Sequence, residues 1–146
     1  MTSLKILTKL EYDILKSAAD RIAAGSAEKY GLDLAQKIDA VFAGLPPHYA
    51  QEFKLLLKVF EFGPPLFGFI FQRFTRMNSQ EKDRYLRNWE TSGLAFKRMG
   101  FQAIKRITLS ALYGSEETWR EIGYRGPWLA QGYAYNYDGK GVQVRD

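Results

Sequence analysis

Apolar residues recur every three or four positions along most of the chain, which is the spacing of one face of an α-helix. This pattern predicts helices over residues 8–24, 33–42, 47–62 and 79–113. The last segment is either one long helix or two helices with a kink near Ser92-Gly93. A short helix is predicted through Trp119 to Ile122, after the turn at residues 114–117.

Polar residues that can cap helices stand at the start of three of these segments. Thr8 and Glu11 form a capping-box pattern, in which a hydroxyl and a carboxylate bind backbone N–H groups that the helix leaves unpaired. Asp33 can cap the second helix, and Asn78 or Ser79 the helix that begins near residue 79. We therefore expect these helices to begin at defined residues.

The segment around residues 63–74 has two possible interpretations. Gly63-Pro64-Pro65 is predicted to interrupt the helix over 47–62, because each proline removes a backbone donor. The following segment, Leu66–Phe74, fits either a short buried helix or an extended run. We favour a helix, because its neighbours are helical and no strand partner is evident nearby.

The end of the chain changes character. Glycines from Gly123 onward disfavour a helix, tyrosines alternate over residues 133–137, and Asp138-Gly139 is a turn signal before alternating valines. A small hairpin or a docking arm fits this pattern. The predicted fold is an all-α bundle of about five to six helices over residues 1–128, with an irregular aromatic tail over residues 129–146.

The composition favours binding over catalysis. The chain has no cysteine, which excludes disulfides, thiolate metal sites and cysteine nucleophiles, and its single histidine, His48, excludes a multi-histidine metal site. Asp33 with Asp39, and Asp13 with Asp20, could pair for acid–base work, but caps and solvated helix faces explain them as well. No phosphate-binding glycine loop is present. We predict no catalytic, cofactor-binding or metal-binding residues in this chain.

The net charge of +5 is concentrated in residues 73–106, where nine Lys and Arg residues stand against three acidic residues. Basic residues such as Arg84 and Arg98 alternate there with aromatic residues such as Trp89. Three interpretations stay open. The segment could bind single-stranded nucleic acid through phosphate contacts and base stacking, or its aromatic rings could point into the core while its cations are solvated. It could also present a cationic face to an acidic protein.

Aromatic residues are abundant in the chain, at 15% of its length, and they crowd the tail. Trp128, Tyr133, Tyr135 and Tyr137 lie within ten residues of one another, in a glycine-rich segment that one small domain cannot easily cover. Tryptophan and tyrosine are enriched at interfaces because they bury a large area and keep a polar end. We infer that part of this segment lies on another chain.

Four segments of the chain follow one another in a characteristic order: RFT from Arg73, RYLRNWETS from Arg84, RMGFQAIK from Arg98, and WREIGYRGPW from Trp119 to Trp128. Together they resemble the small subunit of gluconate 2-dehydrogenase, the subunit 3 family, and the last looks like the closing motif W-x-x-I-G-Y-x-G-P of that family. The resemblance covers about residues 8–128. It implies a small, helical, non-catalytic subunit that accompanies a flavin-dependent oxidoreductase of the glucose–methanol–choline type.

The resemblance also implies where the chemistry takes place. The large subunit would hold FAD and oxidise sugars, sugar acids or other alcohols, a cytochrome subunit could take the electrons, and this chain would assist maturation and stability. Many family members begin with a twin-arginine export signal. This chain shows none, which predicts a cytoplasmic protein unless a signal was removed or the complex is exported to the periplasm. No membrane insertion is expected.

The resemblance and the aromatic tail together give a set of predicted partner contacts. The loop Gly123–Trp128 is the strongest candidate, because glycines permit close approach and Pro127 restricts the chain before binding. The predicted partner-binding residues are Arg84, Trp89, Arg98, Trp119, Gly123, Tyr124, Gly126, Pro127, Trp128, Tyr133, Tyr135 and Tyr137. The main alternative is a basic helical module that binds nucleic acid, and a more distant one is an unrecognised enzyme.

Overall fold

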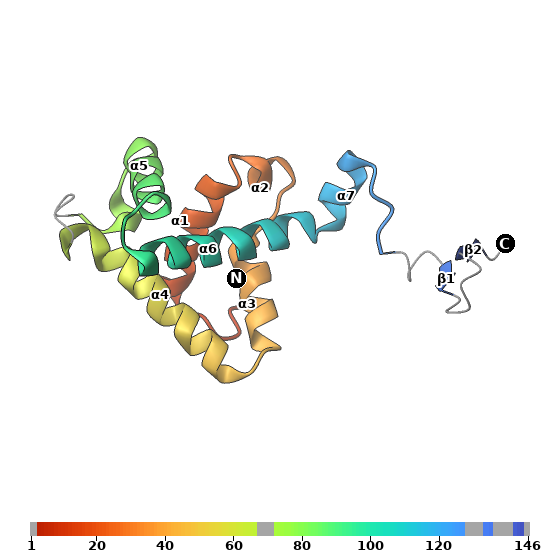
Figure 1. Ribbon diagram of the computed structural model, residues 1–146, viewed down its shortest axis with the longest axis horizontal. Coiled ribbons are helices and arrows are strands. Elements are labelled where there is room, and N and C mark those ends of the chain that lie inside the picture. Colours follow the sequence, from red (N-terminus) through yellow and green to blue (C-terminus); the bar gives the residue numbers. More distant parts are fainter. Residues whose placement is uncertain (1–2, 67–71, 128–132, 136–141, 145–146) are drawn as a thin grey trace. The chain divides into compact units, whose positions relative to one another are not determined.

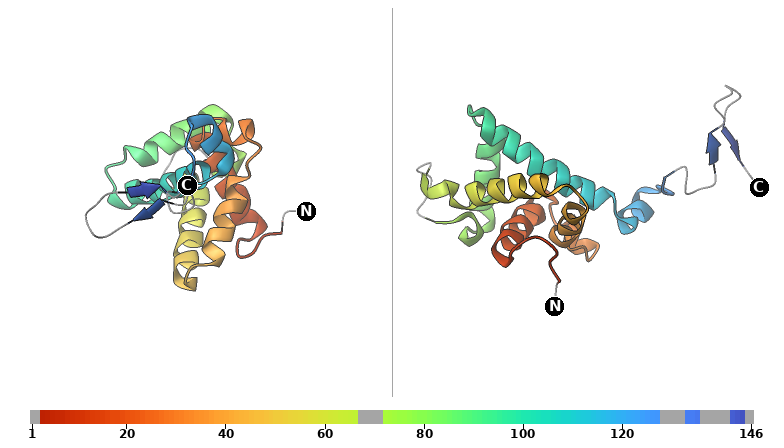
Figure 2. Two further views of the ribbon diagram at one scale, coloured as in Figure 1. Left: turned by 90° about the vertical axis from the view of Figure 1, so that its right-hand side faces the viewer. Right: turned by 90° about the horizontal axis from the view of Figure 1, so that it is seen from below.

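The computed structural model describes residues 3–66, 72–127, 133–135 and 142–144 (Figures 1 and 2). Its contacts divide the chain into two compact units, Met1–Leu112 and Tyr113–Asp146. This division differs from the predicted boundary at residue 128, because the short helix near Trp119 groups with the residues that follow it.

The first unit is an all-α bundle, as predicted. In the described residues it contains α1 (Lys9–Ile22), α2 (Ser26–Lys29), α3 (Leu34–Ala43), α4 (Pro47–Leu66), the 3₁₀ turn η1 (Phe74–Arg76), α5 (Ser79–Glu90) and all but the last residue of α6 (Ala95–Tyr113). The helix α1 lies at the centre, in contact with α2, α3, α4, α5 and η1 (Figure 1). No helix in the described residues is long and apolar enough to cross a membrane.

The predicted caps are confirmed. The Thr8 side chain accepts from the Glu11 N–H while the Glu11 carboxylate accepts from the Thr8 N–H, and Asn78 and Glu81 form the same box at the start of α5. Asp33 caps α3 by accepting from the backbone N–H of Gln36. These caps depend on residues three positions apart, which is why sequence alone predicts them.

An aromatic cluster forms one end of the core. The ring of Phe60 lies 4.6 Å from that of Phe74, 4.8 Å from that of Trp89 and 5.0 Å from that of Tyr85, with the rings tilted or edge-on. All four side chains are buried. Such tilted and edge-on contacts add stability beyond the burial of apolar area, so this cluster joins α4, η1 and α5 firmly.

The predicted interruption at Gly63-Pro64-Pro65 is wrong, because α4 continues to Leu66. A proline at position 64 cannot donate to the carbonyl four residues earlier, which belongs to Phe60. The hydroxyl of Tyr85 donates to that carbonyl instead, at 2.8 Å. A side chain from α5 thus supplies the hydrogen bond that the proline removes, and the helix continues.

Two further predictions concern the segments on either side of η1. Residues 79–113 form two helices, α5 and α6, which meet at a turn where the Ser92 hydroxyl accepts from the Leu94 N–H. The predicted helix over Leu66–Phe74 is not found as such, since Leu66 ends α4 and Phe74 begins the 3₁₀ turn, and residues 67–71 lie outside the described part.

The second unit contains α7 (Glu116–Ile122), β1 (Tyr133–Tyr135) and β2 (Val142–Val144). The two strands are antiparallel, with Tyr133 opposite Val144 and Tyr135 opposite Val142. This pairing agrees with the hairpin, one of the two interpretations of the alternating pattern. Its turn at Asp138-Gly139 lies outside the described residues.

Candidate partner-binding surface at the end of α7

A left-handed glycine ends α7. Gly123 has φ +71°, and the backbone N–H of Tyr124 donates to the carbonyl of Trp119 at 2.9 Å. A bond that spans five residues in this way, next to a left-handed glycine, is the Schellman closure of a helix. This closure often brings together the side chains at the two ends of the bond, which here are Trp119 and Tyr124.

Two aromatic rings pack on this closure. The ring of Tyr124 meets that of Trp119 edge-on at 5.4 Å, and the Trp119 Nε1–H donates to the Tyr113 carbonyl. Gly126 has φ +93°, and a methyl group on it would lie 3.4 Å from Trp119 Cζ3. The backbone at Gly126 therefore passes close to the indole, which holds the loop in one shape.

The spacing W-x-x-I-G-Y-x-G-P thus has a physical explanation within this segment. Its tryptophan and tyrosine pack on each other, its first glycine ends the helix and its second lets the chain pass the indole. Three large side chains around it stay accessible: Ile122 is 60% exposed, Tyr113 54% and Tyr124 45%. We call residues 113–127, which include the helix α7 and the residues on either side of it, the α7 loop. Its exposed side chains form an aromatic and aliphatic surface on an ordered backbone.

The structure brings five of the predicted contact residues together in the α7 loop. Tyr124, Pro127 and Gly123 are exposed, Trp119 is half-buried and Gly126 is buried against it. Trp128 and Tyr137 lie outside the described residues. Tyr133 and Tyr135 belong to β1, where only the backbone is described, so their contacts stay predictions.

Trp89 requires a correction. Its side chain is fully buried within the aromatic cluster, so it is a core residue and has no surface for a partner. Arg84 and Arg98 are exposed, and Arg98 donates to the carbonyl of Ser92. These three residues belong to the first unit, whereas the α7 loop belongs to the second.

Most aromatic side chains of the basic segment, residues 73–106, point into the core. Tyr85, Trp89 and Phe101 are buried, as the core interpretation of the helical spacing predicts. The cation of Lys97 is buried with them, 3.3 Å from Asn88 Oδ1, and this burial lowers the pKa of its amine. The rings therefore contribute to the core rather than form a stacking platform for bases.

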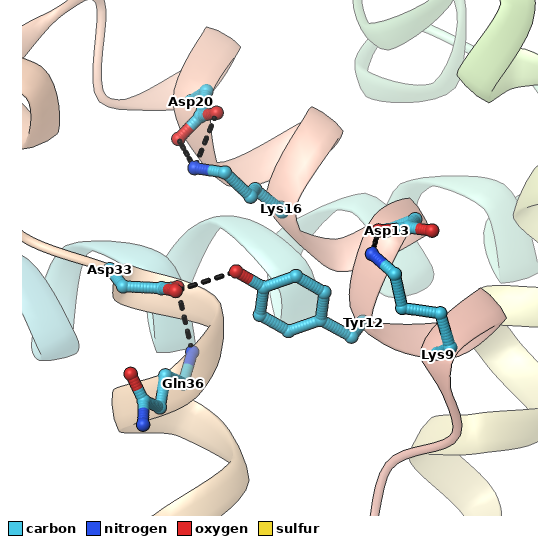
Figure 3. A network of polar contacts seen from close by, with 7 residues as sticks. All are labelled: Lys9, Tyr12, Asp13, Lys16, Asp20, Asp33 and Gln36. Atoms are coloured by element: carbon cyan, nitrogen blue, oxygen red, sulfur yellow. Dashed lines mark hydrogen bonds and ion pairs between the residues drawn. The ribbon is translucent and has the colours of Figure 1, made fainter. Parts of the chain in front are cut away.

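The carboxylates considered for acid–base work take part in ion pairs and hydrogen bonds within the fold. Figure 3 shows Asp13 bound to Lys9 and Asp20 bound to Lys16, one helical turn apart on α1. Asp33 caps α3 and also accepts from the Tyr12 hydroxyl at 2.5 Å (Figure 3). Burial and this hydrogen bond raise the pKa of Tyr12.

The structure gives Asp39 a role that the sequence did not predict. Its carboxylate is fully buried and accepts three consecutive backbone N–H groups, from Lys5 at 2.5 Å, Ile6 at 3.0 Å and Leu7 at 2.8 Å. It therefore fixes the segment before α1 against α3. No local pattern marks this role, because the donors lie more than thirty residues away.

No group of three or more side chains suited to hold a metal ion occurs within the residues that the structure describes. Two buried polar atoms there have no hydrogen-bond partner, Trp89 Nε1 and Thr108 Oγ1.

Comparison with known proteins gives one limited likeness. No family model matches the chain, and no solved structure matches it. A stretch of 63 residues is 33% identical to part of a long-chain-alcohol oxidase of Arabidopsis thaliana. The stretch covers 39% of this chain and 9% of that oxidase, so the chain matches only a small part of the relative's length. The likeness hints at alcohol-oxidising enzymes and carries no evidence for subunit 3 itself.

Proposed function

We propose that this chain is a non-catalytic subunit that binds an FAD-dependent oxidoreductase of the glucose–methanol–choline type and assists its maturation and stability. The large subunit would hold the FAD and oxidise sugars, sugar acids or other alcohols. A cytochrome subunit could receive the electrons. The observation that carries this proposal is the preformed, exposed aromatic surface of the α7 loop.

The physical argument is preorganisation. Ordering a loop on binding costs free energy, and a loop whose rings are already packed avoids much of that cost. The Schellman closure, the Trp119 hydrogen bond and the close approach at Gly126 fix the α7 loop before any partner arrives. Exposed tyrosine on such a rigid support is typical of residues that contribute most to binding.

The likeness to the plant oxidase supports the proposed reaction class. That protein is named as an oxidase of long-chain alcohols, and alcohols are among the substrates expected of the proposed partner. A stretch that makes up 9% of that oxidase is similar to part of this chain. We infer that a related segment acts here beside an oxidoreductase.

Co-expression with the flavin-dependent oxidoreductase encoded nearest to this gene tests the proposal. We expect a stable complex that carries flavin absorbance and elutes ahead of either chain in size-exclusion chromatography. The large subunit expressed alone should be less soluble or bind less FAD. Separate elution of the two chains, with the large subunit fully loaded and stable alone, contradicts the proposal.

A matched pair of variants tests the α7 loop itself. Ile122 and Val41 are both exposed, β-branched helical residues, at 60% and 55% exposure. Ile122→Ser should weaken the complex by about 1–2 kcal/mol, or roughly 5- to 30-fold in Kd, whereas Val41→Ser on α3 should leave it unchanged. Equal affinities for the two variants, measured by isothermal titration calorimetry, would show that the α7 loop is not the contact.

A further inference from the structure

A second exposed apolar surface lies on the first unit. On α4, Leu55 is 64% exposed, and Val59 and Phe62 are also exposed. These residues are spaced four and three positions apart, so they share one face of the helix. The opposite face of α4 carries Phe53, Leu57 and Phe60 into the core, and so the exposed stripe is not needed for the packing of α4.

The helix α6 carries a matching stripe. Phe96 and Met99 are exposed, Met99 to 71%, and Ala103 and Arg106 continue the same face at helical spacing. Phe96 touches the core from outside, since its ring meets that of Trp89 edge-on at 6.3 Å. The stripe therefore begins at the edge of the aromatic cluster and runs outward along α6.

The two stripes border the same helix crossing. A methyl group on the buried Gly100 of α6 would lie 2.7 Å from Leu56 Cδ1 of α4, which shows how closely the two helices approach there. Val59 is the neighbour of Leu56 on the surface of α4, and Phe96 and Ala103 are the neighbours of Gly100 on α6. The stripes thus flank one contact, and we call them together the α4/α6 face.

Cations stand at the edges of the α4/α6 face. The guanidinium carbon of Arg73 lies 5.6 Å from the centre of the Phe62 ring. Arg106 follows Met99 by two helical turns on the same side of α6, and it is exposed. Glu52 is an acidic residue one turn before Leu55 at the far end of α4. The edges along Phe62 and Met99 are therefore basic.

The acidic residues of the basic segment are engaged elsewhere. Asp83 binds Arg21 at 2.5 Å, Glu90 binds Lys105 at 3.2 Å, and Glu81 accepts from a backbone N–H at the start of α5. In the part of the chain described, none of the three binds a cation of the α4/α6 face. The local excess of positive charge is thus available to an approaching anion.

We propose that the α4/α6 face docks a segment of the large oxidoreductase subunit that presents apolar side chains flanked by aspartate and glutamate. This inference rests on the proposed function, and it adds a second contact of stated chemistry. The apolar stripes supply area, while Arg73 and Arg106 select an acidic segment and speed its approach. Two separate contacts on one partner also raise the overall affinity.

Two variants of this chain that each introduce a negative charge, measured in the complex, test this inference. Met99→Glu places a carboxylate on the apolar stripe, and Arg106→Glu reverses an edge charge. We expect the first to raise Kd about tenfold or more and the second about tenfold.

The affinity of the wild-type complex should also fall with added salt, and Arg106→Glu should flatten that dependence. Val41→Glu, on α3, is the matched control and should change Kd less than about twofold. Circular dichroism verifies that each variant is folded.

The outcomes separate this inference from the proposed function. A complex that Ile122→Ser weakens but Met99→Glu and Arg106→Glu leave unchanged refutes the α4/α6 contact alone. Failure of wild-type chains to associate refutes both proposals. If Met99→Glu instead breaks a homodimer of this chain, the face pairs with a second copy and the acidic partner segment is wrong.

Discussion

Replacing Asp39 by asparagine should lower the free energy of unfolding by about 3–4 kcal/mol. A hydrogen bond to a charged group contributes about 1.5–3 kcal/mol, and the Asp39 carboxylate accepts three of them from Lys5, Ile6 and Leu7. The amide of asparagine retains one acceptor oxygen and turns a donor toward the remaining N–H groups. The loss is therefore less than the sum of the three bonds but far above that of a surface change.

Urea unfolding followed by far-ultraviolet circular dichroism measures this loss. The control is Asp13→Asn, which removes an exposed carboxylate that pairs with Lys9 on the surface of α1. Exposed ion pairs contribute at most about 1 kcal/mol, so the control should remain close to the wild type. If the two variants differ by less than about 1 kcal/mol, the buried carboxylate does not fix the N-terminal segment as we argue.

The same variant has a signature in its pH dependence. Burial raises the pKa of the Asp39 carboxyl, but the three N–H donors outweigh it and hold the pKa below its ordinary value of 3.8. A lowered pKa contributes stability above pH 3.8, and this contribution is lost as the pH falls from there through the folded-state pKa. Wild-type stability should decline over that window, and the decline should be smaller in Asp39→Asn.

Two further substitutions test the packing and the α7 loop. Tyr85→Phe should cost about 1–3 kcal/mol, because it leaves the buried Phe60 carbonyl without a donor, and urea unfolding measures this. A cost below about 0.5 kcal/mol would contradict the role of the hydroxyl. Gly126→Ala should cost about 1–2 kcal/mol locally at φ +93° and shift the NMR signal of the Trp119 indole N–H. Gly93→Ala, where open space surrounds the added methyl, should leave that signal unchanged.

The parts of the structure that depend on short-range relations were predictable. The caps at Thr8 and Asn78 need only a partner three residues away, and the hairpin needs only alternation around a turn. Trp89 was placed at an interface because an aromatic residue at helical spacing fits a core and a contact equally well. The pattern cannot distinguish the two until the neighbouring helices are known.

The features that could not be predicted depend on distant partners. The continuation of α4 through Pro64 requires the hydroxyl of Tyr85, which is 25 residues from the Phe60 carbonyl that it binds. Asp39 likewise resembles any polar residue on a helix until the segment before α1 is found against it. The α7 loop lies between these cases, since its glycines were visible in the sequence but the packing of Trp119 on Tyr124 was not.

The hydrogen bond from Tyr85 to Phe60 has a consequence for the way the bundle opens. The last turn of α4 is completed by a group on α5, so it has little reason to persist once α5 separates from it. Amide protons near the end of α4 and those of α5 should then exchange with solvent in the same opening event. Earlier in α4, the ring of Phe53 packs on Phe42 of α3 and Lys54 pairs with Glu11 of α1, so we expect this part of the helix to open in a separate event.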